Sequence, residues 1–576
     1  MSTHGGSAFM AELLSVVANE LALVGVEATT HTGSYPSMET DTVYVVIPHE
    51  YFVVTPTEFQ PTAEQRKRTI AFCVEHPGNA TFEVSIRYAQ LVGAAMDINA
   101  SSQAEMERRG VPTESFKLGY SKSWDAWGGN IGSERPIDIT YLGTTDPRRN
   151  RLLSKYSRLL ESYDTAYLIP PHEPMVAPRD DFLMGKAKLR HLASSRVLLN
   201  LHRGASDALE WVRVLEAICN GCVVISERSR DVPPLVPGEH IVLGRGELLG
   251  IFAKALLEDA DRQNDIRASA YSFVKNELTM AASAERLITL AEKLIRSYPL
   301  KNSYSTTPIR SAVDKAPRPV LDVSFPFGGC VDPANALAYE TVCDRIGATS
   351  LNATVTEWDH PQVDGGRPRV DAILASTRGT SVTDAVDSLK KQTFPIRIVC
   401  GETDSPSLGA LRNRLIRGSD AEYLFILDPV HACFPDAIAR LIQEATNSGL
   451  PAAYSMVSVR NGGLLNCHPI EIERLTRIAY LEGPLLIKRD LIERMGGYAE
   501  EPELIGLEDH DMYCRLADAK VSVRFVKQIL SERSLPEPRL EFIRPIDIEP
   551  LLSWRLLRRR SALLFAGQGL LPEATL

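Results

Sequence analysis

Residues Gly483–Leu516 read GPLLIKRDLIERMGGYAEEPELIGLEDHDMYCRL, and this stretch decides how the C-terminal half of the chain is interpreted. Its apolar start predicts a strand over Pro484–Ile487, and a helix over Arg489–Met495 that ends at a Gly-Gly turn. A loop then leads to an acidic cluster, EDHD at residues 508–511, which opens a second helix. Carboxylates are common at a helix start because they complement its unpaired N–H groups and positive dipole end. The cluster is therefore either a helix cap or a chemical site.

The same stretch resembles the closing part of a family 2, GT-A-type glycosyltransferase, in which a G-G-Y turn precedes a Glu-Asp pair at a helix start. In that family the aspartate of the pair takes the proton from the acceptor hydroxyl. The resemblance assigns this catalytic role to Asp509, with Glu508 beside it, and implies a UDP- or GDP-linked sugar as donor. A plain helix cap is the alternative interpretation.

The region before this stretch also follows the GT-A pattern. A strand is predicted over Val370–Ser376, a helix over Val382–Gln392 and a second strand over Ile396–Cys400. The order resembles the opening of the family, in which strand ends hold the nucleotide base and ribose, and L-R-N at residues 411–413 matches the family's A-R-N element. The resemblance assigns donor binding to Thr377, Arg378, Glu402, Asp404, Arg412 and Asp428.

The metal-binding motif of the GT-A family is altered in this chain. A buried strand is predicted over Tyr423–Leu427, and DPVH follows at residues 428–431. The family has Asp-x-Asp-Asp here, whose carboxylates bind Mn²⁺ or Mg²⁺ because hard cations prefer oxygen ligands. This chain keeps Asp428 but has Val430 second and His431 third, and imidazole suits Mg²⁺ poorly. Asp428 and His431 are the metal-ligand candidates, and metal-dependent activity is expected to be weak, to use His431, or to be absent.

A second informative stretch, SSRVLLNLHRGASDALEWVRVLEAICNGCVVISE, covers residues 194–227. Its pattern predicts a buried strand over Val197–Leu201, a helix over Trp211–Cys219 and a strand over Val223–Ser226. The order resembles the sugar-nucleotide half of GT-B glycosyltransferases, which carry a Glu-Ala-x-x-x-Gly segment before a V-V-I-S strand.

In that family the glutamate that corresponds to Glu216 holds the ribose of the nucleotide, and nearby basic residues hold the diphosphate. Arg203 and Arg213 are the matching candidates, because a planar guanidinium can bond two phosphate oxygens at once. Glu227, where the second strand ends, completes the donor-binding set. The family's usual E-x7-E spacing is broken, since Ala208 stands eight residues before Glu216. The alternative is a solvated helix face with charges at helical spacing.

The N-terminus has a glycine turn that feeds a helix. H-G-G-S at residues 4–7 leads into an apolar helical pattern from Phe9 to Val24, and a short strand is predicted over Glu27–Thr30. This resembles the first loop of a GT-B enzyme, where helix N–H groups face a ligand. The strand that should precede the glycines is missing, so either the domain is abbreviated or another segment supplies that strand. A plain flexible terminus is the alternative.

The predicted α/β organisation has five parts. A GT-B-like pair of Rossmann-type domains covers residues 1–135 and 136–300, and a GT-A-like domain covers residues 368–546. Residues 301–367 are expected to form a linker or small docking unit. Residues 547–576 are expected to form a basic amphipathic tail.

The bulk composition excludes some classes. A net charge of −10 leaves no global basic footprint for nucleic acid. Nine scattered cysteines without a secretory signal argue against a disulfide framework, so a cytoplasmic location is expected. No apolar run reaches the about 18 residues that a membrane span requires. The basic segment at residues 553–564 would contact an anionic membrane or an acidic acceptor, or pack on the body with its arginines in water.

These patterns together predict a bifunctional glycosyltransferase that moves sugars from nucleotide-sugar donors to an acceptor hydroxyl on a glycan, a protein or another molecule. The GT-A module would invert configuration, with Asp509 as the base. In one alternative, a single module is active and the other is a non-catalytic binding scaffold. In another alternative, the acceptor is a nucleic acid.

Overall fold

The computed structural model describes three ranges of the chain: residues 1–299 apart from 174 and 205–206, residues 353–358, and residues 367–534 apart from 406–407, 461, 476–478, 501–503 and 505. The chain divides into two compact units. Among the described residues, the first unit holds 1–149 and 163–299, and the second holds 150–162 and those from 353 on. The predicted basic segment at 553–564 lies outside the described ranges, and no helix within them is long and apolar enough to span a membrane.

The N-terminal half of the first unit is built on a parallel sheet with the strand order β1-β2-β3-β4. All five residues of β2 (Thr69–Cys73) are buried, as its apolar run predicts. Helix α1 (Ala8–Leu23) buries its apolar side in the same core as Ile70 and Phe72 of β2. The other elements are β1 (Tyr44–Val46), α2 (Pro48–Val54), α3 (Ala63–Lys67), α4 (Ala80–Ala89), β3 (Ala94–Asp97), α5 (Ala100–Arg108) and β4 (Thr113–Ser115).

Two expectations for this half are wrong. Glu27–Thr30 forms no strand, because its side chains are exposed or only partly buried and offer no apolar face to a sheet. The strand expected to reach Pro48 ends at Val46, and Pro48 begins α2 instead, since its fixed φ and missing N–H suit the first turn of a helix. No strand within the described residues precedes the glycine turn, and the sheet of this half has the order β1-β2-β3-β4.

The C-terminal half of the first unit holds a second parallel sheet, in the order β6-β5-β7-β8-β9. The central strands β7 and β8 are almost wholly buried, and α8 between them buries eight of its nine residues. Because all pairs are parallel, the carboxyl ends of β5, β7 and β8 meet at one edge. The elements are β5 (Ile137–Leu142), α6 (Pro147–Tyr156), β6 (Thr165–Leu168), α7 (Gly185–Ala193), β7 (Ser195–Asn200), α8 (Trp211–Cys219), β8 (Val223–Glu227), β9 (Val242–Gly244) and α9 (Leu249–Glu258).

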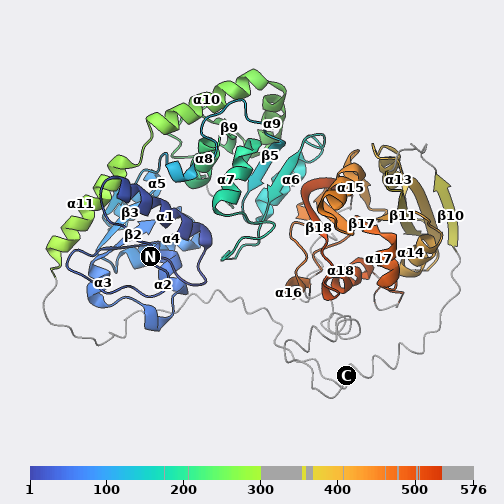
Figure 1. The fold of residues 1–576 in the computed structure, drawn as a ribbon, viewed down its shortest axis with the longest axis horizontal. Helices are drawn as coiled ribbons and strands as arrows, with labels where there is room; N and C mark the ends of the chain where they lie inside the picture. Colours follow the sequence, from blue (N-terminus) through green and yellow to red (C-terminus); the bar gives the residue numbers. More distant parts are fainter. Residues whose placement is uncertain are drawn as a thin grey trace, which may run out of the picture. The chain divides into compact units, whose positions relative to one another are not determined.

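Two long helices close the first unit. α10 (Ala260–Asn276) packs on α8, and α11 (Ala281–Ser297) runs back to pack against α1 and β3 of the other half (Figure 1). A backbone hydrogen bond of 2.7 Å from Tyr120 N to Leu278 O fixes the crossing. The expectation that the last helix returns to the first half is confirmed.

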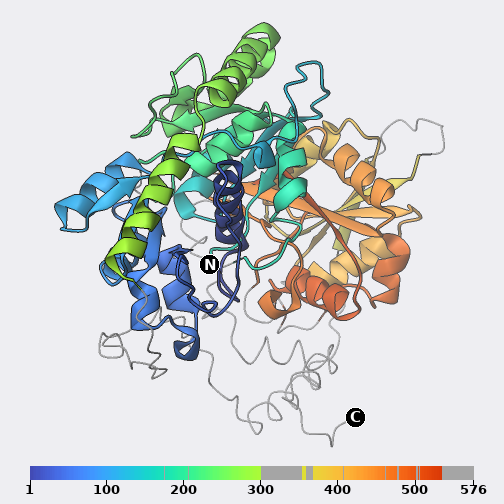
Figure 2. The same cartoon turned by 60° about the vertical axis from the view of Figure 1, so that its left-hand side comes forward.

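The second unit is one mixed sheet with the order β10-β12-β11-β13-β17-β15-β18-β14, and β16 pairs with β15. β12, β11 and β13 are mutually parallel, so their carboxyl ends share an edge, and antiparallel β17 begins at that same edge. Helices cover both faces of this sheet (Figures 1 and 2), with α13 and α15 on one face and α14, α17 and α18 on the other.

The bounds in this unit are β10 (Ala353–Trp358), β11 (Val370–Thr377), α13 (Thr383–Lys390), β12 (Arg397–Thr403), α14 (Leu408–Arg417), β13 (Tyr423–Leu427), β14 (His431–Cys433), α15 (Ala437–Ser448), β15 (Ala452–Val459), β16 (Leu464–Leu465), α16 (Ile472–Leu475), β17 (Leu485–Lys488), α17 (Arg489–Arg494), α18 (Glu508–Asp518) and β18 (Arg524–Arg533). Residues 483–516 thus form a strand, a helix and a second helix, as expected. β10 lies within the segment expected to form a linker or small docking unit, and it pairs antiparallel with β12.

Gly409, in the first turn of α14, is required for the close approach of that helix to the loop after α17. A Cβ there would lie 1.7 Å from the carbonyl oxygen of Ala499. We expect Gly409→Ala to lower the free energy of unfolding of the second unit by about 1–3 kcal/mol through overpacking. Gly418→Ala, whose Cβ would have no neighbour closer than 3.5 Å, is the control and should be nearly neutral in urea unfolding. Equal stability of the two variants would contradict this assignment.

Candidate functional site

A cleft of about 300 Å³ lies in the first unit where the carboxyl ends of its two sheets face each other. His76 and Asn99 follow β2 and β3 on one wall, and Gly143 and His202 follow β5 and β7 on the other. Residues after parallel strands commonly form ligand sites in α/β folds. Of the predicted donor-binding residues, the cleft is lined by Arg203, Arg213 and Glu216.

Two arginines converge on one carboxylate at the start of α8. Arg213 contacts Glu210 at 2.5 Å and donates to Asn200 Oδ1 at 3.1 Å, and Arg149 also donates to Glu210. Asp146 accepts hydrogen bonds from the first N–H groups of α6, which orients Arg149. Burial disfavours the charged form of Glu210, but the two guanidinium groups outweigh it and hold the pKa of Glu210 below its usual value. The pair of arginines can therefore face an anion from a fixed position.

Glu216 lies one turn further along α8 and is 4% exposed. Its carboxylate binds Lys188 Nζ of α7 at 2.7 Å, and Lys188 also binds Glu12 of α1 at 3.0 Å. Burial raises the pKa of Glu216, and Lys188 only partly offsets this. This chain of charges ties the two halves of the first unit together beside the cleft.

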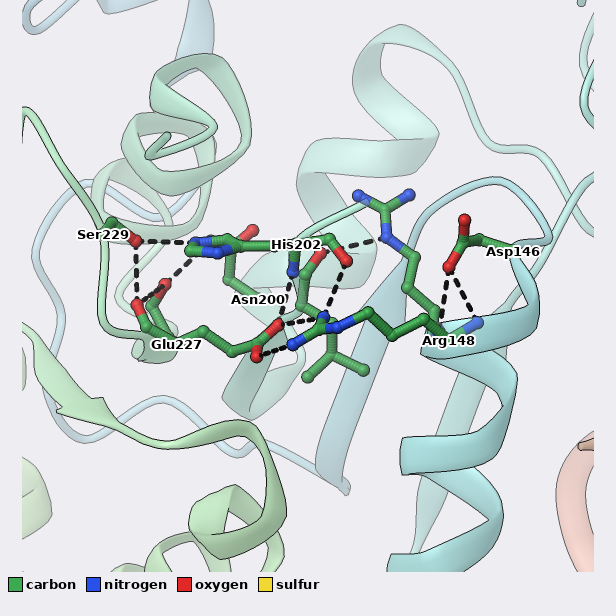
Figure 3. Close-up of polar contacts among 9 residues, drawn as sticks. Asp146, Arg148, Asn200, His202, Glu227 and Ser229 are labelled. Carbon is green, nitrogen blue, oxygen red and sulfur yellow. Dashed lines mark hydrogen bonds and ion pairs between the residues drawn. The ribbon is translucent and has the colours of Figure 1, made fainter. Parts of the chain in front are cut away.

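Glu227, which is predicted to bind the donor, is held by other groups of the chain. Its carboxylate accepts hydrogen bonds from both terminal nitrogens of Arg148 and, at 2.7 Å, from the backbone N–H of His202 (Figure 3). Arg148 also donates to His202 O, and the His202 ring contacts Ser229 Oγ at 2.8 Å. Glu227 is not among the residues that line the cleft, so its contacts position His202 there, and direct donor binding by Glu227 stays a prediction.

Several cleft residues were not singled out from the sequence. Arg149 follows a predicted strand and a Gly-Thr-Thr turn, which is a usable signal for a phosphate-binding loop. His76 is different, because its place after a predicted strand indicates a crevice residue, with a purely structural histidine as the alternative. Its Nδ1 is buried without a hydrogen-bond partner in the described structure. Lys188 gave no sequence signal, because only the packing of α7 on α8 brings it to Glu216.

In the second unit, Arg412 joins the two predicted acidic residues. This arginine of α14 donates to Asp428 Oδ1 after β13 and, at 3.0 Å, to Asp509 Oδ1 in the first turn of α18. Gly483 lies beside both carboxylates, since a Cβ there would be 3.8 Å from Asp509 Oδ2 and 3.9 Å from Asp428 Oδ2. The ring of Tyr498 stacks 4.8 Å from the guanidinium. The sequence-predicted residues Asp509, Asp428 and Arg412 thus form one cluster.

The two aspartates of this cluster differ in charge state. Burial raises the pKa of Asp509 to about 7; Arg412 opposes this, and Asp428 and Glu508 reinforce it. Burial acts on Asp428 as well, but Arg412 and His431 hold its pKa below the usual value. Burial also raises the pKa of Glu508, whose carboxylate faces the N–H of Leu408 at 3.4 Å. A carboxylate with a pKa near neutrality is suited to proton transfer.

The raised pKa of Asp509 has a consequence for stability. Between the ordinary carboxyl pKa and about 7, the folded state keeps a proton that the unfolded state loses, so stability falls as pH rises, by up to about 1.4 kcal/mol per pH unit. We expect Asp509→Asn to flatten this decline between about pH 5 and about pH 7 in denaturation curves. If Asp509 titrated with an ordinary carboxyl pKa, the free energy of unfolding of the wild type and of the variant would change with pH in the same way over this range.

The residues at the predicted metal motif do not suit a divalent cation. His431 is 1% exposed and contacts Glu482 at 3.2 Å, and Glu482 is bound by Arg533 at 3.0 Å. Asp428 is engaged by Arg412, and Val430 offers no side-chain ligand. No group of three His, Cys, Asp or Glu side chains within the described ranges is arranged to hold a metal ion. Asp428 and His431 are thus each engaged by another side chain, and their role as metal ligands stays a prediction.

The residues predicted to bind the nucleotide lie at the carboxyl ends of β11 and β12. Arg378 contacts Asp404 at 3.0 Å, and Glu402 accepts a hydrogen bond of 3.1 Å from Gly379 N. Thr377 ends β11, the strand next to β13. These groups share a sheet edge with Asp428, because the three strands are parallel.

Residues 149–289 match a family model described as "Glycosyl transferase-like". The matched segment contains Arg149, Arg203, Arg213 and Glu216. The prediction of a glycosyltransferase is confirmed at the level of this family match. No curated protein matches the chain.

Several solved structures share parts of the fold at low similarity. Staphylococcus aureus TarS is 12% identical, with a TM-score of 0.25, and the match covers 29% of this chain and 37% of that chain. Anabaena HepE in complex with UDP is 12% identical with a TM-score of 0.32, and covers 51% and 100% respectively. TarM is 10% identical with a TM-score of 0.30, and covers 39% and 55%. The chain therefore spans well under two thirds of the TarS chain.

Proposed function

We propose that the first unit transfers a glycosyl group from a UDP- or GDP-linked donor to an acceptor hydroxyl. The observation that carries the proposal is the start of α8, where Arg213 and Glu216 line a cleft within the segment that matches the glycosyltransferase family. Arg213 offers a planar fork of donors for the diphosphate, and Glu216 offers carboxylate oxygens for the ribose hydroxyls.

The surroundings of α8 support an anionic ligand. Arg149 contacts the same carboxylate as Arg213, so two guanidinium groups meet at the carboxyl ends of β5 and β7. Arg203 lies further along the cleft beside the His172 ring. An arginine held in place before the ligand arrives loses less entropy when it binds the phosphates.

The second unit is proposed to be another glycosyltransferase, of the GT-A type, that inverts configuration. The specific observation in its favour is Asp509, which lies beside Gly483 and Asp428 with a pKa of about 7. In the proposed step the acceptor hydroxyl gives its proton to Asp509 while its oxygen bonds to the anomeric carbon. The bond from that carbon to the nucleoside diphosphate breaks, and the diphosphate leaves with the electron pair.

Two transferases on one chain would act in succession on one acceptor. Tethering raises the local concentration of the first product at the second site, so the intermediate need not diffuse away. The alternative of one active unit and one binding scaffold predicts a single transfer. A nucleic-acid acceptor remains a further alternative, which salt-dependent DNA binding would support.

Incubation with a panel of nucleotide sugars and hydroxyl acceptors, followed by mass spectrometry, tests the proposal. Glu216→Ala and Asp509→Asn are the two site variants. Because the units are proposed to act in succession, the variant in the unit that acts first should remove both product masses, and the other variant should leave only the mass of the first transfer. The exposed Glu292→Ala, on α11, is the control and should leave both. A single product mass in the wild type, lost with only one of the two site variants, would assign the activity to that unit alone. Absence of donor turnover by the wild type with every nucleotide sugar would reject the proposed function.

A further inference from the structure

The positive charge between Asp428 and Asp509 is the guanidinium of Arg412. Its two terminal nitrogens donate one to each carboxylate, and its side chain is only 3% exposed. Tyr498 covers the guanidinium face at 4.8 Å, so the group cannot swing away freely. This cluster is compact and internally paired.

A divalent cation would need the same carboxylate oxygens. Mn²⁺ and Mg²⁺ require several oxygen ligands at short distance, and Asp428 and Asp509 are the carboxylates that flank Gly483. Val430 offers no side-chain oxygen, and His431 is buried and already bound to Glu482. A cation at Asp428 would also meet the positive charge of Arg412, which donates a hydrogen bond to that carboxylate.

We infer that the second unit works without a divalent cation, and that Arg412 takes the place of one beside Asp428. The inference rests on the proposed glycosyl transfer in that unit. Arg412 acts as a positioning residue: it fixes both carboxylates and keeps a permanent positive charge on the side where the diphosphate leaves. The step balances without a metal, because Asp509 receives the proton and the diphosphate departs as an anion.

Mn²⁺ binding to the full chain, measured by electron paramagnetic resonance, tests the inference directly. Bound Mn²⁺ is assigned to this site when the Asp428→Asn substitution abolishes its binding. We expect none in the wild type and none in Val430→Asp, because Arg412 still holds Asp428. The double variant Arg412→Gln with Val430→Asp should gain one Mn²⁺ per chain, since two carboxylates are then free to bind it. Thermal unfolding verifies that each variant is folded.

Three results would overturn the inference. The first is a wild-type Mn²⁺ that disappears in Asp428→Asn. The second is Val430→Asp binding Mn²⁺ as tightly as the double variant, which would show that Arg412 does not exclude the ion. The third is a folded double variant that binds none. A separate titration with UDP and GDP in EDTA keeps the two proposals distinguishable, because absent nucleotide binding by the second unit rejects its proposed function and leaves the Mn²⁺ result standing.

Discussion

Asp509→Asn is expected to lower the rate of glycosyl transfer by the second unit about 10²–10⁴-fold, the usual contribution of a positioned general base. The amide cannot accept the hydroxyl proton, yet it is nearly the same size as the carboxylate. It can still accept a hydrogen bond from Arg412, whose Nη1 lies 3.0 Å from Asp509 Oδ1. Donor binding should therefore change much less than kcat.

The pH dependence gives an independent test of the same residue. Because the base must be ionised and the pKa of Asp509 is raised to about 7, kcat/KM of the second unit should rise with pH through about 7 and then level off. Asp490→Asn, on α17 with a side chain 66% exposed, is the matched control and should retain rate and profile. An unchanged rate in Asp509→Asn would show that Asp509 is only a helix cap.

Arg213→Ala is expected to lower kcat/KM of the first unit about 10²–10³-fold, comparable with the loss of one preorganised donor to a developing anion. The side chain is 18% exposed and fixed by Glu210 and Asn200, so it meets the diphosphate without rearrangement. The loss should appear in nucleotide affinity and in the rate of transfer alike. Steady-state kinetics with the donor varied measures both.

The matched control for Arg213 is Arg296→Ala. Arg296 lies on α11 with a side chain 70% exposed and pairs with Glu292 one turn away, a contact worth about 0.3–0.5 kcal/mol. Its removal should leave donor affinity unchanged. Equal effects of the two substitutions would mean that Arg213 acts through general charge and not through contact with the donor.

Buried apolar runs were predictable from the sequence to the residue. The structure gives β13 and α8 the bounds expected for Tyr423–Leu427 and Trp211–Cys219. β13 lies between Glu422 and Asp428, and α8 lies between Glu210 and Asn220, and both segments are largely buried, so local pattern and tertiary burial agree. The α/β class, with two parallel sheets in the first unit, is confirmed on the same grounds.

Short edge strands were not predictable. β4 (Thr113–Ser115) and β9 (Val242–Gly244) are three residues long and partly exposed, so neither shows alternation or an apolar run. Their position beside a buried neighbour makes them strands. β18 (Arg524–Arg533), the last described strand, contains charged residues that mask its apolar pattern.

The candidate sites were partly predictable. Arg213 and Glu216 line the cleft, and Arg412, Asp428 and Asp509 meet in the second unit. What the sequence could not show is which partner each charge takes. Glu227 pairs with Arg148, 79 residues away in the sequence, and His431 contacts Glu482, 51 residues away. Pairings over such separations depend on strand order, which no local pattern contains.

The central claim is that one chain carries two sites for an activated sugar. Calorimetric titration of the full chain with UDP and GDP nucleotides, compared between wild type and Arg213→Ala, tests it most directly. The account predicts two nucleotide sites per wild-type chain and one in the variant. Absence of heat with both nucleotides, or a single site that Arg213→Ala leaves intact, would contradict it.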